Sequence, residues 1–81
     1  MADRVELTLR PKSDVKPIDL ETAERIGRVA RAETVELGDG GAVFGFASAP
    51  EDAATARGNL ELAARFELGA HWRNRYELLI R

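Results

Sequence analysis

The sequence predicts an α+β fold in which a four-stranded antiparallel sheet carries two helices on one face. Four segments alternate apolar and polar residues, as half-buried strands do, and two longer segments place apolar residues three and four apart, as amphipathic helices do. The order is strand, helix, strand, strand, helix, strand. Two right-handed crossovers within one sheet then give the strand order 4-1-3-2.

The central part of the chain predicts a β-hairpin that turns at Asp39-Gly40. Both central residues of a type I′ turn need positive φ, which Asp-Gly tolerates well. This register sets Gly38 opposite Gly41, and directly opposed residues share a face of the sheet. The inner face is expected to carry Val35, Leu37, Ala42, Phe44 and Phe46, and the outer face Thr34, Glu36, Val43, Gly45 and Ala47.

A capping box, Ser48-Ala49-Pro50-Glu51, predicts a helix over residues 49–68. Gly69 is suited to end it in left-handed geometry. Gly58-Asn59 in its middle costs about 1 kcal/mol relative to alanine, and the sequence leaves open whether the helix breaks there. The expected buried stripe consists of Ala53, Ala56, Leu60, Ala63, Ala64 and either Phe66 or Glu67.

Residues 4–10 alternate cleanly and predict the first strand, with Val5, Leu7 and Leu9 facing inward. Asp19 can cap a first helix over residues 20–32. Ion pairs are expected at Glu21–Arg25 and Glu24–Arg28, because both have the favourable i, i+4 order. The apolar stripe of this helix is expected to be Leu20, Ala23, Ile26, Val29 and Ala30.

Residues 71–81 also alternate and predict the last strand. The inward set is Trp72, Asn74, Tyr76, Leu78 and Ile80. The outward set, which would share the uncovered face of the sheet, is His71, Arg73, Arg75, Glu77 and Leu79.

Length and composition indicate one domain, residues 1–81, without an enzyme site. The chain has no cysteine and one histidine, so it offers no thiol chemistry and no multi-histidine metal site; we expect no cofactor and no metal. His71 has no nucleophile placed beside it by the sequence, and the acidic residues are spread over helix surfaces. No apolar run approaches the roughly 20 residues that span a bilayer, which favours a cytoplasmic setting.

In element order the chain resembles the ferredoxin-like α/β plait, a fold that serves many functions. Plait proteins commonly dimerise through the uncovered sheet face, so this resemblance implies a small association module that forms a homodimer or docks a protein partner. The expected contact residues are Val43, Gly45, Ala47 and Leu79. A designed scaffold without a natural function fits the same features, since arginine outnumbers lysine ten to two and glutamine is absent.

Residues 43–53 (VFGFASAPEDA) are similar to the third strand and following turn of the RNA-recognition motif, in which aromatic residues flank a glycine. The resemblance implies an alternative function, RNA binding through base stacking on the open face. Arg73, Arg75 and His71 would then contact phosphates. The chain departs from that family because its first strand has no aromatic residue and the hairpin register turns Phe44 and Phe46 toward the helices. A formal net charge of −2 disfavours general polyanion binding.

Overall fold

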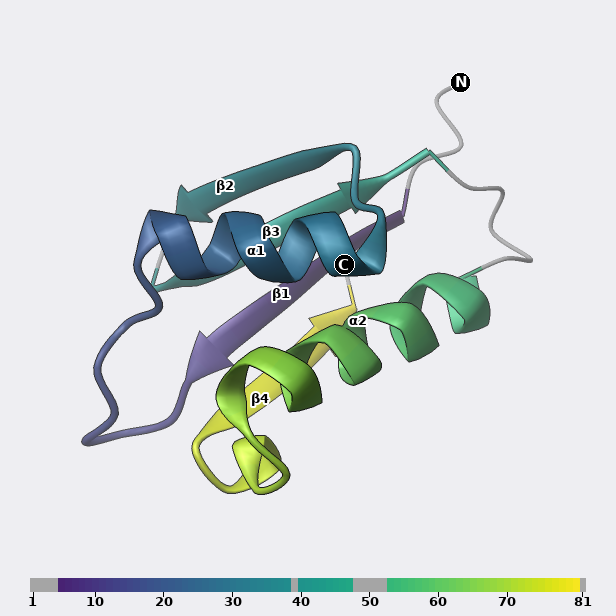
Figure 1. Ribbon diagram of the computed structural model, residues 1–81. Helices are drawn as coiled ribbons and strands as arrows, with labels where there is room; N and C mark the ends of the chain where they lie inside the picture. The colour runs from purple at the N-terminus through teal and green to yellow at the C-terminus, as the bar shows by residue number, and fades with distance from the viewer. Residues whose placement is uncertain (1–4, 39, 48–52, 81) are drawn as a thin grey trace.

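The computed structural model describes residues 5–38, 40–47 and 53–80, and it has the predicted element order (Figure 1). The four strands form one antiparallel sheet in the order β2-β3-β1-β4, which confirms the predicted strand order. This is the arrangement of the ferredoxin-like plait. The elements are β1 (Val5–Pro11), α1 (Leu20–Ala30), β2 (Thr34–Gly38), β3 (Gly41–Phe46), α2 (Ala53–Leu68), the 3-10 turn η2 (Trp72–Asn74) and β4 (Tyr76–Ile80).

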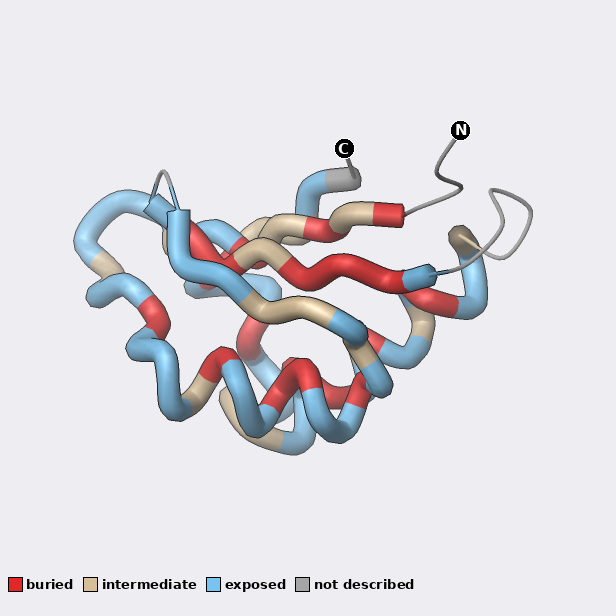
Figure 2. Tube along the Cα trace, turned by 90° about the horizontal axis from the view of Figure 1, so that it is seen from above, coloured by how far each residue is buried: buried red, intermediate tan, exposed pale blue. Residues whose placement is uncertain are grey.

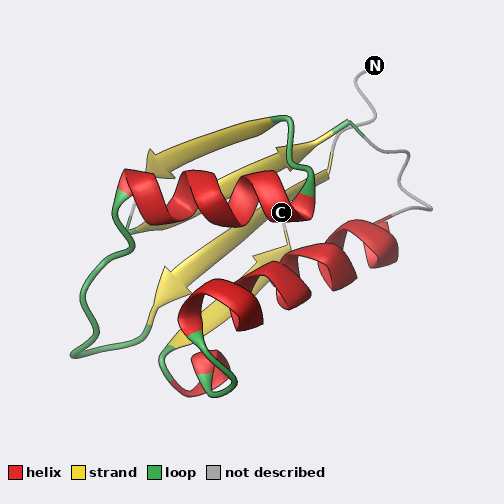
Figure 3. Ribbon diagram, viewed as in Figure 1, coloured by secondary structure: helices red, strands yellow, loops and turns green. Residues whose placement is uncertain are grey.

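The molecule has two layers, a sheet and a pair of helices. Both helices lie in front of the sheet in Figures 1 and 3, and both lie below it in the view from above in Figure 2. The buried residues fall between these layers. The largest fully buried side chains are Phe44, Leu7, Leu9, Ile26 and Leu60.

The β2–β3 hairpin has the predicted register, with Gly38 opposite Gly41 and Val35 opposite Phe44. Gly40 has the positive φ that the turn requires, +82°. Asp39 and the predicted capping box at residues 48–51 lie outside the described residues. Phe44 and Phe46 are buried in the core, as the register predicts.

The inward side chains of β2 are less completely buried than the sequence predicts. Val35 is half-buried and Leu37 is 48% exposed, although both face the helices. The reason is the position of β2 at the edge of the sheet, where a side chain has neighbours on one side only. Close approach of α1 shelters Val35, since a methyl group at Gly27 would overlap with Val35 Cγ2.

Helix α1 begins at its predicted cap, where Asp19 Oδ1 accepts a hydrogen bond from the Thr22 N–H at 2.8 Å. It ends at Arg31, which has left-handed geometry with φ of 63°. Ala23, Ile26 and Ala30 are buried as predicted, together with Gly27. The prediction was wrong for the two outer members of the stripe, because Leu20 and Val29 are 48% and 50% exposed.

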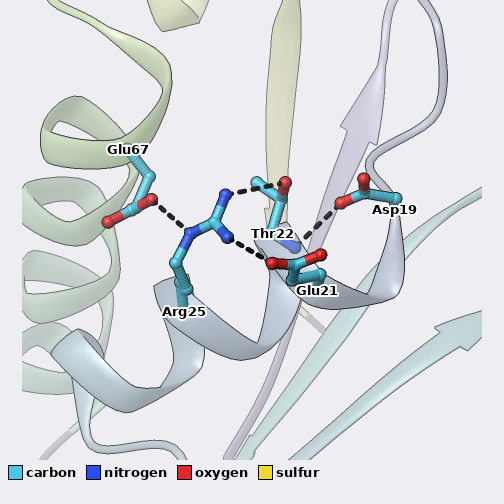
Figure 4. Close-up of polar contacts among 5 residues, drawn as sticks. All are labelled: Asp19, Glu21, Thr22, Arg25 and Glu67. Atoms are coloured by element: carbon cyan, nitrogen blue, oxygen red, sulfur yellow. Dashed lines mark hydrogen bonds and ion pairs between the residues drawn. The ribbon is translucent and has the colours of Figure 1, made fainter.

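Helix α2 runs unbroken through Gly58 and Asn59. Of the two residues that could complete the inward stripe of α2, Glu67 faces inward, because Phe66 is 79% exposed. Glu67 accepts a hydrogen bond from Arg25 Nε at 3.0 Å, and this ion pair joins the two helices (Figure 4). The same guanidinium pairs with Glu21 at 3.2 Å, as predicted, and the bond to Glu67 holds the pKa of Arg25 above its ordinary value.

The last strand is shorter than predicted, because β4 begins only at Tyr76. Gly69, with φ of +99°, turns the chain out of α2, and its carbonyl accepts a hydrogen bond from the Trp72 N–H. Trp72 is 3% exposed and joins the core. A 3-10 turn is what brings this large side chain inward directly after the helix.

Gly41 tests the close packing of β3 against β1. A Cβ atom there would lie 2.8 Å from the Leu9 carbonyl oxygen and 3.2 Å from Arg10 Cα, and neither backbone atom can move aside. We expect Gly41→Ala to lower the free energy of unfolding by about 1–3 kcal/mol in urea titration. Gly38→Ala is the matched control, because a methyl group there meets nothing within 4 Å. Equal effects of the two substitutions would contradict this packing.

Asp19 gives a pH-dependent contribution to stability. Hydrogen bonds from the side chain and backbone of Thr22 lower the pKa of Asp19 in the folded chain. Its contribution is therefore complete above the unfolded carboxyl pKa of about 3.9 and is lost as the pH falls through the lower folded value. We expect Asp19→Ala to destabilise the protein at neutral pH, and the difference from wild type to shrink in acid.

Asp19→Asn is the control, since asparagine caps a helix without titrating. Its advantage over Asp19→Ala should not depend on pH. Urea unfolding of the three proteins between neutral and acidic pH measures this. A wild-type advantage that persists unchanged in acid would rule out the capping role of the carboxylate.

Candidate functional site

A row of four opposed residues crosses the open face of the sheet, and two of them, Val43 and Leu79, are apolar. The registers set Glu36 opposite Val43, Val43 opposite Thr8, and Thr8 opposite Leu79, so the row crosses all four strands. Val43 and Thr8 are half-buried, Leu79 is 38% exposed, and Glu36 is exposed at the β2 end. Both helices lie on one side of the sheet in Figure 2. The row residues alternate along their strands with the buried Leu7, Leu9 and Phe44, so they face the other side. Apolar side chains in the middle of this face are thus open to contact.

Beside this row the face is small and polar. Gly45 lies between Thr34 on β2 and Glu6 on β1, and it is buried. Thr34 and Glu6 are both half-buried. Three of the four predicted contact residues, Val43, Gly45 and Leu79, therefore share one face. The fourth, Ala47, is exposed directly after the end of β3.

An ion pair borders the row on its other side. Arg10 on β1 and Glu77 on β4 are directly opposite, and Arg10 donates to Glu77 Oε1 from Nε at 3.0 Å and from Nη2 at 2.5 Å. Both side chains are more than a third exposed, at 48% and 40%. Exposed pairs of this kind contribute little to stability, about 0–1 kcal/mol. The pair neutralises Arg10, the one basic side chain that the described strands place on this face.

The predicted basic patch of His71, Arg73 and Arg75 does not lie on the open sheet face. These residues belong to the turn that precedes β4 rather than to a strand. Arg73 pairs with Glu61 of α2 and lies over the Trp72 ring, 4.8 Å from its centroid. Arg75 Nη2 donates to the Leu68 carbonyl at 2.6 Å, at the end of α2. Both arginines are thus engaged with the helix layer.

Helix α2 exposes a pair of apolar side chains that sequence reasoning missed. Leu62 and Phe66 are 66% and 79% exposed, and residues four apart are neighbours on a helix surface. The buried members, Ala56, Leu60, Ala63 and Ala64, follow one another at spacings of four, three and one. Phase alone could have separated Leu62 and Phe66 from this stripe, because with 3.6 residues per turn both lie more than about 90° from its centre.

No group of three or more His, Cys, Asp or Glu side chains among the described residues is placed to hold a metal ion. A hollow of about 350 Å³ opens between the start of α1 and the β2–β3 hairpin, and none of the described residues that line it is ionisable. Its walls are Pro17, Ile18, Leu37, Gly38, Gly40 and Gly41.

Searches beyond the chain itself give no family. Comparison with protein-family models, with curated proteins and with solved structures found no match. None of the helices in the described segments is long and apolar enough to cross a membrane. The surfaces described above are therefore the basis for proposing a function.

Trp72 is an aromatic residue of the core, whereas Phe66 is an aromatic residue of the surface, and substitution should affect stability differently at the two positions. Trp72 is 3% exposed, so Trp72→Ala should lower the free energy of unfolding by about 3–5 kcal/mol. Phe66 is 79% exposed, and Phe66→Ala should change it by less than about 0.5 kcal/mol. Chemical denaturation of both variants measures this. Comparable losses would show that Phe66 has a packing role that its exposure does not indicate.

Proposed function

We propose that this domain is a non-enzymatic association module that docks a protein partner, in the first instance a second copy of itself, through the open sheet face. The observation that supports this is the transverse row of Val43, Thr8 and Leu79, which neither α1 nor α2 covers. Small and apolar side chains in the middle of a face allow two sheets to approach closely. The charges at Glu36 and at the Arg10–Glu77 pair would form the rim.

The size of this face limits the strength of the contact. The four strands have at least five residues each, and four strands of that length present a plane of about 300 Å² at ordinary strand spacings. Stable interfaces bury about 800 Å² on each partner. A contact confined to the open face is therefore expected to be weak and to form only at high protein concentration. Such affinity suits a module whose association is regulated by local concentration.

RNA binding is the second candidate from the sequence, and no feature of the geometry favours it. The aromatic residues that would stack bases, Phe44 and Phe46, are buried under the helices. Arg73 and Arg75 are bound to groups of α2, away from the open face. We therefore propose protein association alone.

Val43→Arg tests the proposal, because it sets a charged side chain in the middle of the row. Leu62→Arg is the matched control, since it introduces the same charge at an exposed apolar position on the helix layer. We expect light scattering over a wide concentration range to show self-association of wild type and Leu62→Arg. Val43→Arg should weaken it at least tenfold while the circular dichroism spectrum stays native.

Two results would contradict association through this face. One is a wild-type mass of a single chain at every concentration. The other is a Val43→Arg protein that associates as strongly as wild type. Dissociation by Leu62→Arg in place of Val43→Arg would move the contact to the helix layer.

A further inference from the structure

Strand β2 is an edge of the sheet that no other described strand covers. It pairs with β3 on one side, and an antiparallel strand directs every second N–H and C=O away from its partner. Natural edges are commonly blocked by proline, a bulge or a lysine. β2 (TVELG) contains neither proline nor lysine, and its Leu37 side chain is 48% exposed. This edge is therefore competent to pair with another strand.

Two side chains of opposite charge lie beside that edge and form no ion pair with another described residue. Glu24 and Arg28 are exposed on α1 and, together with Val35 of β2, line a hollow of about 340 Å³. The sequence predicts an ion pair between them, but none forms in the described structure, although Glu21–Arg25 and Arg57–Glu61 have the same spacing and do pair. Both charges are thus available to a partner at the edge.

The positions of these charges fit a two-fold axis at Glu36. Helix α1 runs opposite to β2 in Figure 1, and Gly27 lies against Val35. One strand residue advances about 3.3 Å and one helix residue about 1.5 Å. Glu36 is therefore level with the helix about two residues before Gly27, close to residue 25. That level lies between Glu24 and Arg28.

We propose that a second copy of this chain pairs antiparallel with β2 about that axis, so that each Glu24 meets Arg28 of the other copy. The same symmetry sets Val35 opposite Leu37 of the second copy, and opposed residues share a face. Both incompletely buried side chains of the edge then pack against each other on the helix side. The occupant is specified by this charge complementarity, because the pattern of Glu24 and Arg28 is its own complement when reversed.

The pairing would join two four-stranded sheets into one of eight strands. Its open face would be twice as large, about 600 Å² by the same strand spacings, and so closer to the size of a stable interface. Edge pairing does not depend on the association proposed for the open face. It supplies a different contact on a different side of the molecule.

The proposed register also contains one unfavourable contact, which can be used to test that register. Glu36 on the axis lies opposite Glu36 of the second copy, and like charges directly opposite each other destabilise a strand pair. Glu36→Gln should therefore tighten the edge dimer severalfold. No other register of β2 places this residue opposite itself.

Charge reversal at Glu24 and Arg28 gives a decisive experiment. Glu24→Arg or Arg28→Glu alone sets like charges opposite each other twice, and each should weaken dimerisation about tenfold in sedimentation or light scattering. The double variant Glu24→Arg/Arg28→Glu restores both pairs and should regain wild-type affinity. Mixing the two single variants should also restore it, as a heterodimer. Both positions are exposed, so the variants keep the fold.

Each outcome decides the edge proposal separately from the open-face one. Single variants that dimerise like wild type, or a double variant that does not recover, overturn edge pairing even when Val43→Arg abolishes association. Normal dimers of Val43→Arg that respond to the charge reversals support edge pairing and contradict the open-face contact. If both contacts form, wild type exceeds two chains in mass, and each kind of variant reduces it to a dimer. A monomer at every concentration overturns both.

Discussion

The close fit of β3 between its two neighbours is the constraint on which the structure depends. Gly41 has no room for a side chain against the Leu9 carbonyl, and this contact sets where the hairpin meets β1. From that point the two-residue period of the sheet determines every other position. Phe44 and Phe46 enter the core, Val43 and Gly45 face away from it, and β1 aligns Leu7 and Leu9 with the helices. A shift of one residue would exchange the two faces.

The sequence was sufficient where a local pattern and a global arrangement agree. Alternation in β1 and β3, the Asp39-Gly40 turn signal and the cap at Asp19 predict strand order, register and the start of α1, because each of these depends on neighbouring residues. The three open-face residues Val43, Gly45 and Leu79 follow from the same parity. Their role as a contact surface stays a prediction.

The wrong predictions have one physical origin. The pattern of a segment carries no information about which other elements pack against that segment. Residues 71–75 alternate as a strand does, but they form a 3-10 turn that places Trp72 in the core. In this turn Arg73 and Arg75 contact α2. Leu37 is on the predicted face of the sheet but is only partly buried, because β2 is at the edge. Exposure at an edge is a property of the assembled sheet and not of any segment.

Sheet order also has a consequence for how the chain is made. β1 is an inner strand, yet its two partners come from very different distances, and β4 pairs with it across about seventy residues. During synthesis, β1, β2 and β3 are complete well before residues 76–80 exist. One side of β1 is then a bare strand with Val5, Leu7 and Leu9 beside it. Until β4 forms, the unpaired side of β1 can pair with a strand of another chain, as an exposed sheet edge can.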